Sequence, residues 1–358
     1  MKMKANIWLS LFLLIAASIA VNLSVVNATG ETGWSSASVP VTIAHLFDVF
    51  MVNSTDGWIV GDSGTILHWN GTAWNNVTSP TKADLRAVYM LNSTDGWAVG
   101  LGGVTIHWNG TAWENVTSGV TVNLLDVGAT YSPYYYAVGA SGTIIKWNGT
   151  DWVPETIPTS LGIRGIEMYK GVNPSPPPAF IWYGWAVGDS GTILHYSNST
   201  DSWAETESPT SAQLNDVSVV GANDAWAVGS SWTIIRWNGT DWQNVACPKT
   251  GYGYLTAIDM VNATDGWAMG YNGTILHWNG TAWNEVSSPT TETLNSIFMV
   301  DANEGWAVGL HGTILHWTGT KWIPEFPIIP FIPILMATIM LFVAIKVSVK
   351  KRVSPSAS

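Results

Sequence analysis

A short phrase recurs seven times along this chain, and no other feature of the sequence limits the possible folds as strongly. The pentapeptide Gly-Trp-Ala-Val-Gly, or a close variant, recurs at intervals of 39, 39, 49, 41, 41 and 39 residues between its aromatic positions. Those positions are Trp58, Trp97, Tyr136, Trp185, Trp226, Trp267 and Trp306. A period of about 40 residues is typical of solenoids and propellers, in which each unit packs against its neighbours.

Two further aromatic positions follow each copy of the phrase. The first ends a Gly-Thr-Ile-Leu-His-Trp-like run, at Trp69, Trp108, Trp147, Tyr196, Trp237, Trp278 and Trp317. The second comes after a short turn, at Trp74, Trp113, Trp152, Trp203, Trp242, Trp283 and Trp322. Nineteen of the 23 Trp residues occupy these three columns. We therefore interpret most of the tryptophans as framework residues.

Each repeat divides into four short β segments separated by turn sequences. In the first repeat they are residues 46–52, the segment around Trp58, residues 65–69 and a segment that starts at Trp74. Asn70-Gly71, between the third and fourth segments, suits a tight hairpin turn with positive φ. Seven such units with no helix between them predict an all-β fold, a seven-bladed β-propeller with four antiparallel strands per blade.

An open solenoid is the main alternative to a closed ring. It would need atypical polar repeats as caps, whereas the first and last repeats resemble the middle ones. The segment Thr32-Gly33-Trp34-Ser35-Ser36 looks like the fourth strand of a preceding blade. We expect it to pair in the seventh blade, competing with or lying beside the Trp322 segment, and so to close the ring and remove exposed edges.

Apolar segments at both ends indicate export and membrane anchoring. Lys2 and Lys4 precede an apolar run over residues 7–20, which is typical of a secretory signal peptide, with a retained anchor as the alternative. Residues 328–345 form an uncharged 18-residue stretch followed by four basic residues. This pattern predicts one C-terminal transmembrane helix with its basic flank inside the cell.

These features predict five segments. They are a signal peptide and short leader (1–28), a propeller ectodomain (29–323), a Pro-rich linker (324–327), the transmembrane helix (328–345) and a basic cytoplasmic tail (346–358). Six of the 14 basic residues and none of the 25 acidic residues lie in the two apolar ends and the tail. The extracellular part is therefore strongly acidic, which argues against nucleic acid as a partner.

The repeat resembles a known class of propeller. The Leu-x-x-Val-x-Met-x-Asn, Gly-Trp-Ala-Val-Gly and Gly-Thr-Ile-Leu-His pattern over residues 46–322 is similar to propellers of the photosystem II assembly and stability factor type, which are related to sialidase-like Asp-box propellers. The chain departs from the Asp-box at the third turn, where it has Asn-Gly-Thr-Ala-Trp. Pro324-Glu325-Phe326-Pro327 resembles the C-terminal anchors of archaeal surface proteins, some of which a sortase-like transpeptidase processes; a retained anchor is our expectation.

Arginines and carboxylates of the innermost strands are the candidate binding residues. Arg86 and Arg164 share one position of the innermost strand, so both are expected to face the central channel. The carboxylates expected there are Asp48, Asp126, Glu167, Asp216 and Asp259. Arginines that grip a carboxylate beside an acid and a nucleophile would make a sialidase-like, carbohydrate-active hydrolase or lyase. That is the enzymatic alternative.

The histidines are interpreted as structural. Five of the seven occupy one repeat column on separate blades, at His68, His107, His195, His277 and His316. Side chains on separate blades at equivalent places point outward and do not converge on a metal. With a single cysteine, Cys247, the chain also lacks an intrachain disulfide or a multi-cysteine metal site. We expect no metal and no cofactor.

Fourteen Asn-x-Ser/Thr sequons stand in the sequence. Turn chemistry alone also selects Asn-Gly-Thr and Asn-Ser-Thr, so a structural origin stays open. Nine of them fall in turns of one propeller face and are the glycosylation candidates: Asn53, Asn70, Asn92, Asn109, Asn148, Asn198, Asn238, Asn262 and Asn279. Residues 321–327 span at most about 25 Å, so we expect the opposite face to lie close to the membrane.

The fourth repeat is ten residues longer than its neighbours and contains a proline-rich insert at residues 170–178. Proline favours a stiff extended loop, which is expected to protrude on the sequon-bearing face. Its candidate contact residues are Asn173, Pro176, Trp182 and Tyr183. An insertion without a role is the alternative.

Taken together, these patterns predict a monomeric, membrane-anchored propeller at the cell surface. Its predicted function is a non-catalytic binding or assembly scaffold for protein or glycan partners. The framework columns account for most of the distinctive residues, and neither a nucleophile with a base nor a phosphate-binding loop is recognisable.

Overall fold

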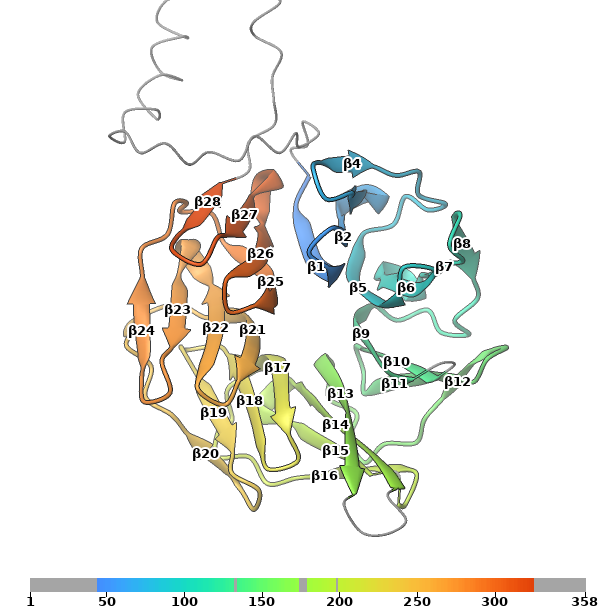
Figure 1. Cartoon of the computed structure of the whole chain (residues 1–358). Helices are drawn as coiled ribbons and strands as arrows, with labels where there is room; N and C mark the ends of the chain where they lie inside the picture. Colours follow the sequence, from blue (N-terminus) through green and yellow to red (C-terminus); the bar gives the residue numbers. More distant parts are fainter. Residues whose placement is uncertain (1–43, 132–133, 174–178, 198, 325–358) are drawn as a thin grey trace, which may run out of the picture. The chain divides into compact units, whose positions relative to one another are not determined.

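The computed structural model describes residues 44–131, 134–173, 179–197 and 199–324. The chain divides into two compact units, Met1–Ser35 and Ser36–Ser358, and all described residues belong to the second. They form seven four-stranded antiparallel sheets, and in each sheet the strands follow one another in chain order (Figure 1). The predicted all-β seven-bladed propeller is therefore confirmed. The predicted transmembrane helix and the Trp34 segment lie outside the described residues.

The strands have the following bounds. Blade one contains β1 (Leu46–Asn53), β2 (Asp56–Gly61), β3 (Ile66–Trp69) and β4 (Trp74–Asn76). Blade two contains β5 (Leu85–Asn92), β6 (Asp95–Gly100), β7 (Thr105–Trp108) and β8 (Trp113–Val116). Blade three contains β9 (Leu124–Tyr131), β10 (Tyr134–Gly139), β11 (Thr143–Trp147) and β12 (Trp152–Pro154). Blade four contains β13 (Ile163–Asn173), β14 (Ala179–Gly188), β15 (Ile193–Ser197) and β16 (Ser202–Glu205).

The last three blades are built in the same way. Blade five contains β17 (Leu214–Gly221), β18 (Asp224–Gly229), β19 (Ile234–Trp237) and β20 (Trp242–Asn244). Blade six contains β21 (Leu255–Asn262), β22 (Asp265–Gly270), β23 (Ile275–Trp278) and β24 (Trp283–Val286). Blade seven contains β25 (Leu294–Asp301), β26 (Glu304–Gly309), β27 (Ile314–Trp317) and β28 (Trp322–Pro324). Short 3₁₀ turns link second to third strands: η1 (Asp62–Gly64), η2 (Leu101–Gly103), η3 (Asp189–Gly191), η4 (Tyr271–Gly273) and η5 (Leu310–Gly312).

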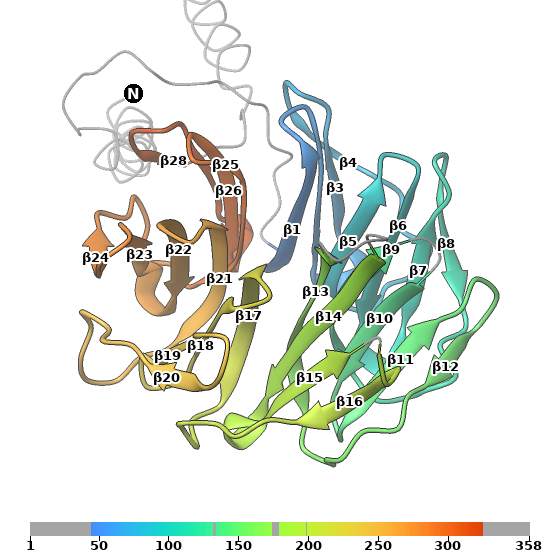
Figure 2. The same cartoon turned by 60° about the horizontal axis from the view of Figure 1, so that its bottom comes forward.

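The sheets form a closed ring around a central channel. The innermost strand of each blade contacts that of the next blade, and β1 also contacts β25, so the first and seventh blades are neighbours. Figure 2 shows these innermost strands gathered at the centre, with the other strands of each blade fanning outward. An open superhelix, the alternative considered above, is excluded for the described residues.

The core lies between blades, because each second strand is buried on both of its faces. Such strands read as continuous apolar runs rather than as alternating ones, which accounts for the recurring Trp-Ala-Val phrase and its apolar variants. In β2, for example, Gly57 to Gly61 are all buried. Trp58 on this strand is only 2% exposed and packs against Trp108 and Trp113 of blade two, with ring centroids 4.7 and 5.3 Å apart.

The insert of the fourth repeat is mainly a longer hairpin, which corrects the expectation of a loop. β13 continues to Asn173 and β14 begins at Ala179, and these two residues pair across the ladder. Pro176 lies outside the described residues, and Trp182 is a strand residue opposite Lys170. Tyr183 does not protrude as expected: it is 7% exposed and packs in the core between blades four and five.

Candidate functional site

Every innermost strand begins with a β-bulge, and the bulges shape the mouth of the channel. In β1 the register passes from Leu46 opposite Gly61 to Asp48 opposite Val60, so Phe47 is the extra residue. The same shift occurs in the other six innermost strands. A bulge redirects the side chain of the extra residue. The seven bulged residues are Phe47, Arg86, Leu125, Arg164, Asn215, Thr256 and Asn295, and all of them line one pocket.

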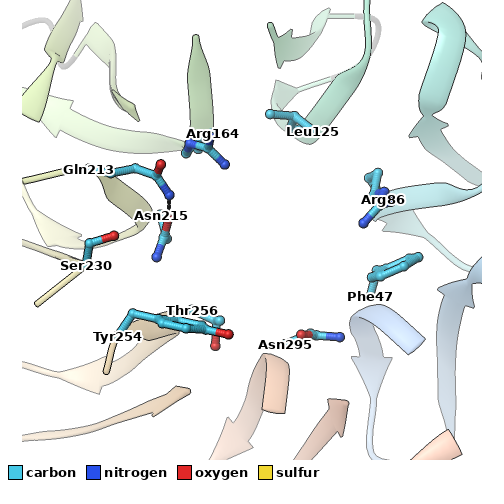
Figure 3. Close-up of a pocket in the computed structure, with 10 residues that line it drawn as sticks. All are labelled: Phe47, Arg86, Leu125, Arg164, Gln213, Asn215, Ser230, Tyr254, Thr256 and Asn295. Carbon is cyan, nitrogen blue, oxygen red and sulfur yellow. Dashed lines mark hydrogen bonds between the residues drawn. The ribbon is translucent and has the colours of Figure 1, made fainter. Parts of the chain in front are cut away.

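This pocket, which we call the mouth pocket, has a volume of about 420 Å³. Gln213, Ser230 and Tyr254 complete its lining, and Figure 3 shows the side chains around an open centre. Gln213 and Tyr254 directly precede innermost strands, and Ser230 lies between β18 and β19. The mouth pocket therefore opens on the face that is opposite the nine candidate sequons.

Arg86 and Arg164 reach the mouth pocket, as predicted, but they are held differently. The Arg164 Nε donates to Asp189 Oδ1 at 2.6 Å. The Arg86 guanidinium lies 3.8 Å from the centroid of the Phe47 ring, and only a long contact of 3.4 Å joins its Nη2 to Asp84. The buried Arg86 Nε has no hydrogen-bond partner among the described residues. Because this Nε is buried, the Nη groups are the donors that Arg86 can offer to a ligand.

The side of the pocket formed by blades five to seven presents acceptors. The Asn215 Nδ2 donates to the Leu255 carbonyl at 2.6 Å, and the Asn295 Nδ2 donates to the Leu46 carbonyl at 2.7 Å. Each bond fastens one blade to the next. The Asn215 Oδ1 accepts from the Gln213 Nε2 at 2.6 Å, which leaves the oxygens of Gln213 and Asn295 as acceptors at the mouth, whereas Arg86 and Arg164 offer donors. The pocket is therefore bipolar.

Three of the predicted carboxylates lie immediately below the mouth. Asp48, Asp126 and Asp216 line a smaller cavity of about 100 Å³ together with Arg86 and Arg164. The structure thus brings these five predicted residues together. Glu167 and Asp259 are not among the residues that line either cavity.

Each of the five carboxylates crosses a blade junction by accepting a backbone N–H from the following blade. Asp48 accepts from Val88 at 2.8 Å. The equivalent pairs are Asp126 with Ile166, Asp216 with Ile258, Glu167 with Val219 and Asp259 with Met299. Asp48, Asp126 and Asp216 also accept the N–H of the residue that follows them. These bonds make the carboxylates cross-links between blades.

Burial shifts the titration of these carboxyl groups upward. Loss of solvation raises the pKa of Asp48 and of Asp259 to about 6 and the pKa of Asp216 to about 7. The pKa of Asp126 lies well above its usual value, first through burial and then through repulsion from Asp216 and Asp48. Burial likewise raises the pKa of Glu167 well above its usual range.

At the position that Asp48 occupies in blade one, larger and smaller residues alternate around the ring. It is occupied in chain order by Asp48, Ala87, Asp126, Gly165, Asp216, Ala257 and Ser296. Each aspartate therefore faces a small residue on the next blade. Seven is an odd number, so a strict alternation would put two aspartates side by side where the seventh blade meets the first. There Ser296 donates its hydroxyl to Asp48 Oδ1 at 2.6 Å, which avoids placing two carboxylates side by side.

In blades one, two and six the column histidine pairs with an aspartate at the start of the second strand, which gives it the expected structural role. The His68 Nε2 lies 2.8 Å from Asp56 Oδ1, and the ring stacks on Trp58 at 4.3 Å. The same pairs recur at His107 with Asp95 and at His277 with Asp265. A fixed spacing of 12 residues in the sequence carried this signal, which the sequence analysis passed over.

The described sequon asparagines form side-chain turns. In Asn70 the Oδ1 accepts the N–H of Thr72 at 3.0 Å and its hydroxyl at 2.8 Å. Equivalent bonds occur at Asn53, Asn92, Asn109, Asn148, Asn238, Asn262 and Asn279. Asn198 lies outside the described residues. The turns account for the recurrence of Asn-x-Thr on backbone grounds and leave the asparagines exposed.

No protein-family model and no curated protein matches the chain. The fold is similar to that of a solved structure described as YCF48 bound to D1 peptide, with a TM-score of 0.63, 16% identity and coverage of 81% of this chain and 96% of that one. YCF48 from Cyanidioschyzon merolae has a TM-score of 0.61 and 17% identity, with coverage of 77% of this chain and 96% of that one. The WD40 β-propeller domain of Doa1 has a TM-score of 0.66 and 13% identity, with coverage of 81% of this chain and 98% of that one. The predicted likeness to photosystem II assembly propellers is confirmed for the fold. At these identities the likeness concerns the fold alone.

Proposed function

We propose that this chain is an exported, membrane-anchored propeller that acts as a non-catalytic scaffold and binds a partner protein at the mouth pocket. One observation carries the proposal: Arg86 is stacked on Phe47 at the mouth, with one long contact to Asp84, opposite the amide oxygens of Gln213 and Asn295. Its fold neighbours include a propeller described with a bound peptide and WD40 propellers, which supports a protein partner.

The chemistry of the mouth pocket favours an acidic, extended segment of that partner. The carboxylates of the chain outnumber its basic side chains, 25 to 14, and two of its few arginines converge on this pocket. A carboxylate pairs with Arg86 or Arg164, and the peptide N–H groups beside it meet the acceptors of Asn295 and Gln213. This arrangement gives the ligand a direction across the mouth.

A carbohydrate-active hydrolase is the second candidate, because Arg86 and Arg164 share a cavity with Asp48, Asp126 and Asp216. The bonding of these carboxylates favours the scaffold. Each is held by two backbone N–H groups at a blade junction, which suits a cross-link better than a nucleophile that must reach a substrate. Release of nitrophenol from nitrophenyl glycosides by the wild type, lost in Asp126→Asn, would support the hydrolase instead.

The surface location and the glycans are part of the same proposal. The mouth pocket opens on the face where the connections to the innermost strands lie, so we place this face toward the membrane and the sequon-bearing face away from it. Membrane fractionation with protease protection tests the anchor and its orientation. A soluble full-length chain in the native cells would contradict the anchoring.

A capture experiment with charge-matched variants tests the binding site. The full-length protein, Arg86→Ala and Lys82→Ala are each cross-linked in native membranes and purified. Lys82 is exposed and does not line the mouth pocket, so its variant removes the same charge elsewhere. We expect the same partner proteins with wild type and Lys82→Ala and their loss with Arg86→Ala. Identical capture by all three would refute the mouth pocket as the binding site.

A further inference from the structure

The repeat is broken at one place on the mouth face, in blade five. The residue five places before the second aromatic column is glycine with positive φ in the other six blades: Gly64, Gly103, Gly142, Gly191, Gly273 and Gly312. Blade five carries Trp232 there, with φ of 60°. A bulky side chain in this conformation is a backbone outlier that neighbouring contacts must stabilise. Such an outlier is a reason to look for a function nearby.

The neighbouring connection has changed to accommodate the tryptophan. The segment from Pro248 to Leu255 is two residues longer than the equivalent one from Pro80 to Leu85. Gly253 packs on the Trp232 indole so closely that a Cβ there would lie 1.8 Å from Cζ2. Tyr252, the residue before this glycine, has 83% of its surface exposed.

Two further tyrosines complete an aromatic surface beside Tyr252. The Tyr252 and Tyr271 rings are 5.5 Å apart at 85°, and the Tyr254 and Tyr271 rings are 5.4 Å apart at 45°. We call these three residues the aromatic notch. Its base is fixed, because the Tyr271 N–H donates to the Tyr254 carbonyl at 3.0 Å and Tyr254 forms a β-bridge with Ser230.

The aromatic notch is continuous with the mouth pocket. Tyr254 belongs to both, and in Figure 3 its ring lies at the edge of the pocket, next to Thr256. A peptide segment of the partner whose carboxylate lies near Arg86 therefore crosses the aromatic notch if it leaves the mouth pocket on the side of blade six. Tyr252 is exposed, and Tyr254 and Tyr271 are half-buried. Tyrosines next to a charged pocket are typical of the residues that dominate binding energy at interfaces.

We propose that the aromatic notch binds a proline residue of an acidic, extended peptide, whose carboxylate occupies the mouth pocket. The part of this inference that places a carboxylate in the mouth pocket rests on the proposed function. Rings that meet nearly edge to face form a narrow notch, whereas a sugar ring stacks on a broad aromatic face. The rings are in contact with each other, so a proline ring packs into the corner that they form, and a polyproline helix loses little entropy on binding because it is extended beforehand.

Two synthetic peptides of equal length and charge test the proline preference. One alternates glutamate with proline and the other alternates glutamate with alanine over about ten residues, with capped ends, so the register of binding is immaterial. Their affinities for the full-length protein in detergent are measured by fluorescence anisotropy. We expect the proline peptide to bind at least about fivefold more tightly. Tyr252→Ala should remove this preference without weakening the alanine peptide, and Tyr252→Phe should retain it.

The two proposals fail in different ways. Equal affinity for both peptides, or an unchanged proline preference in Tyr252→Ala, would overturn the proline site. Arg86→Ala should lower the affinity for both peptides by the same factor. If Arg86→Ala changes neither affinity while Tyr252→Ala still removes the proline preference, the mouth pocket does not bind the carboxylate, and the proline site in the aromatic notch is retained. An oligogalacturonate that binds better than either peptide, and only with Tyr252 present, would show a sugar site instead. Tyr252 is too exposed for its loss to unfold the ring, and circular dichroism verifies this.

Discussion

The indole of Trp306 on blade seven packs against the indole of Trp69 on blade one, with ring centroids 4.8 Å apart. Trp306 also meets Trp74 edge to face at 5.2 Å. The same three-ring contact occurs between blades one and two, where Trp58 packs on Trp108 and Trp113. The junction that closes the ring is thus built like the others, although no described connection crosses it. Among the described residues, side-chain packing and hydrogen bonds hold this junction together.

Trp306→Ala should open the ring at this junction. Trp306 is fully buried, so truncation should lower the free energy of unfolding by about 3 to 5 kcal/mol. Trp185→Ala is the matched control, since Trp185 makes the same contacts at a junction that the chain crosses. We expect similar losses in thermal stability but earlier proteolytic cleavage near blades one and seven in Trp306→Ala. Identical cleavage patterns would show that closure is not the weak point.

Ser296→Asp should lower the free energy of unfolding, because the junction between blades seven and one would then contain two aspartates. It places a second carboxylate where the Ser296 hydroxyl now donates to Asp48. Two buried like charges resist joint ionisation, so we expect a loss of about 2 kcal/mol or more at pH 8 and a smaller loss at pH 4.5. Ser296→Ala loses the hydrogen bond without adding a charge and should depend less on pH. Denaturant titrations at both pH values separate the two variants, and equal pH dependence would contradict the argument.

The buried carboxyls predict that the propeller is more stable in mild acid. The pKa of Asp48 and Asp259 is about 6 and that of Asp216 about 7, all above the ordinary 3.8. Their contribution to stability is therefore fully present below about pH 4 and is lost as pH rises through 6 to 7. Since one pK unit corresponds to about 1.4 kcal/mol, the change is on the order of 3 to 4 kcal/mol for each of these groups.

Asp216→Asn isolates this effect from the rest of the charge. Asparagine is neutral at every pH and keeps an oxygen for the Ile258 N–H, so the variant should gain stability relative to wild type as pH rises from 5 to 8. Melting temperatures of both proteins across this range provide the measurement. A difference that stays constant with pH would mean that Asp216 ionises in the folded state as easily as in the unfolded one.

The repeat predicts the fold in detail, while the site depends on features that pattern alone does not contain. Trp58 and its counterparts define the blades because their column has a fixed place in each period. The sequence does not show that a bulge turns Arg86 and the residue after it toward the same channel, nor that Asp48 reaches across to Val88. Those outcomes depend on how neighbouring blades twist against each other. The replacement of a repeated glycine by Trp232, in contrast, is readable in the sequence and was passed over.

The final prediction separates turn chemistry from glycosylation at the sequons. Asn70 Oδ1 accepts from Thr72 and from the N–H of Ala73, and aspartate can accept the same bonds. Asn70→Asp should therefore keep the stability of the wild type within about 0.5 kcal/mol, whereas Asn70→Ala should lose about 1 kcal/mol. In the native host, mass spectrometry should find glycan at Asn70 and none in either variant. If the native asparagine is unmodified and Asn70→Ala is still destabilised, the turn alone accounts for the sequon.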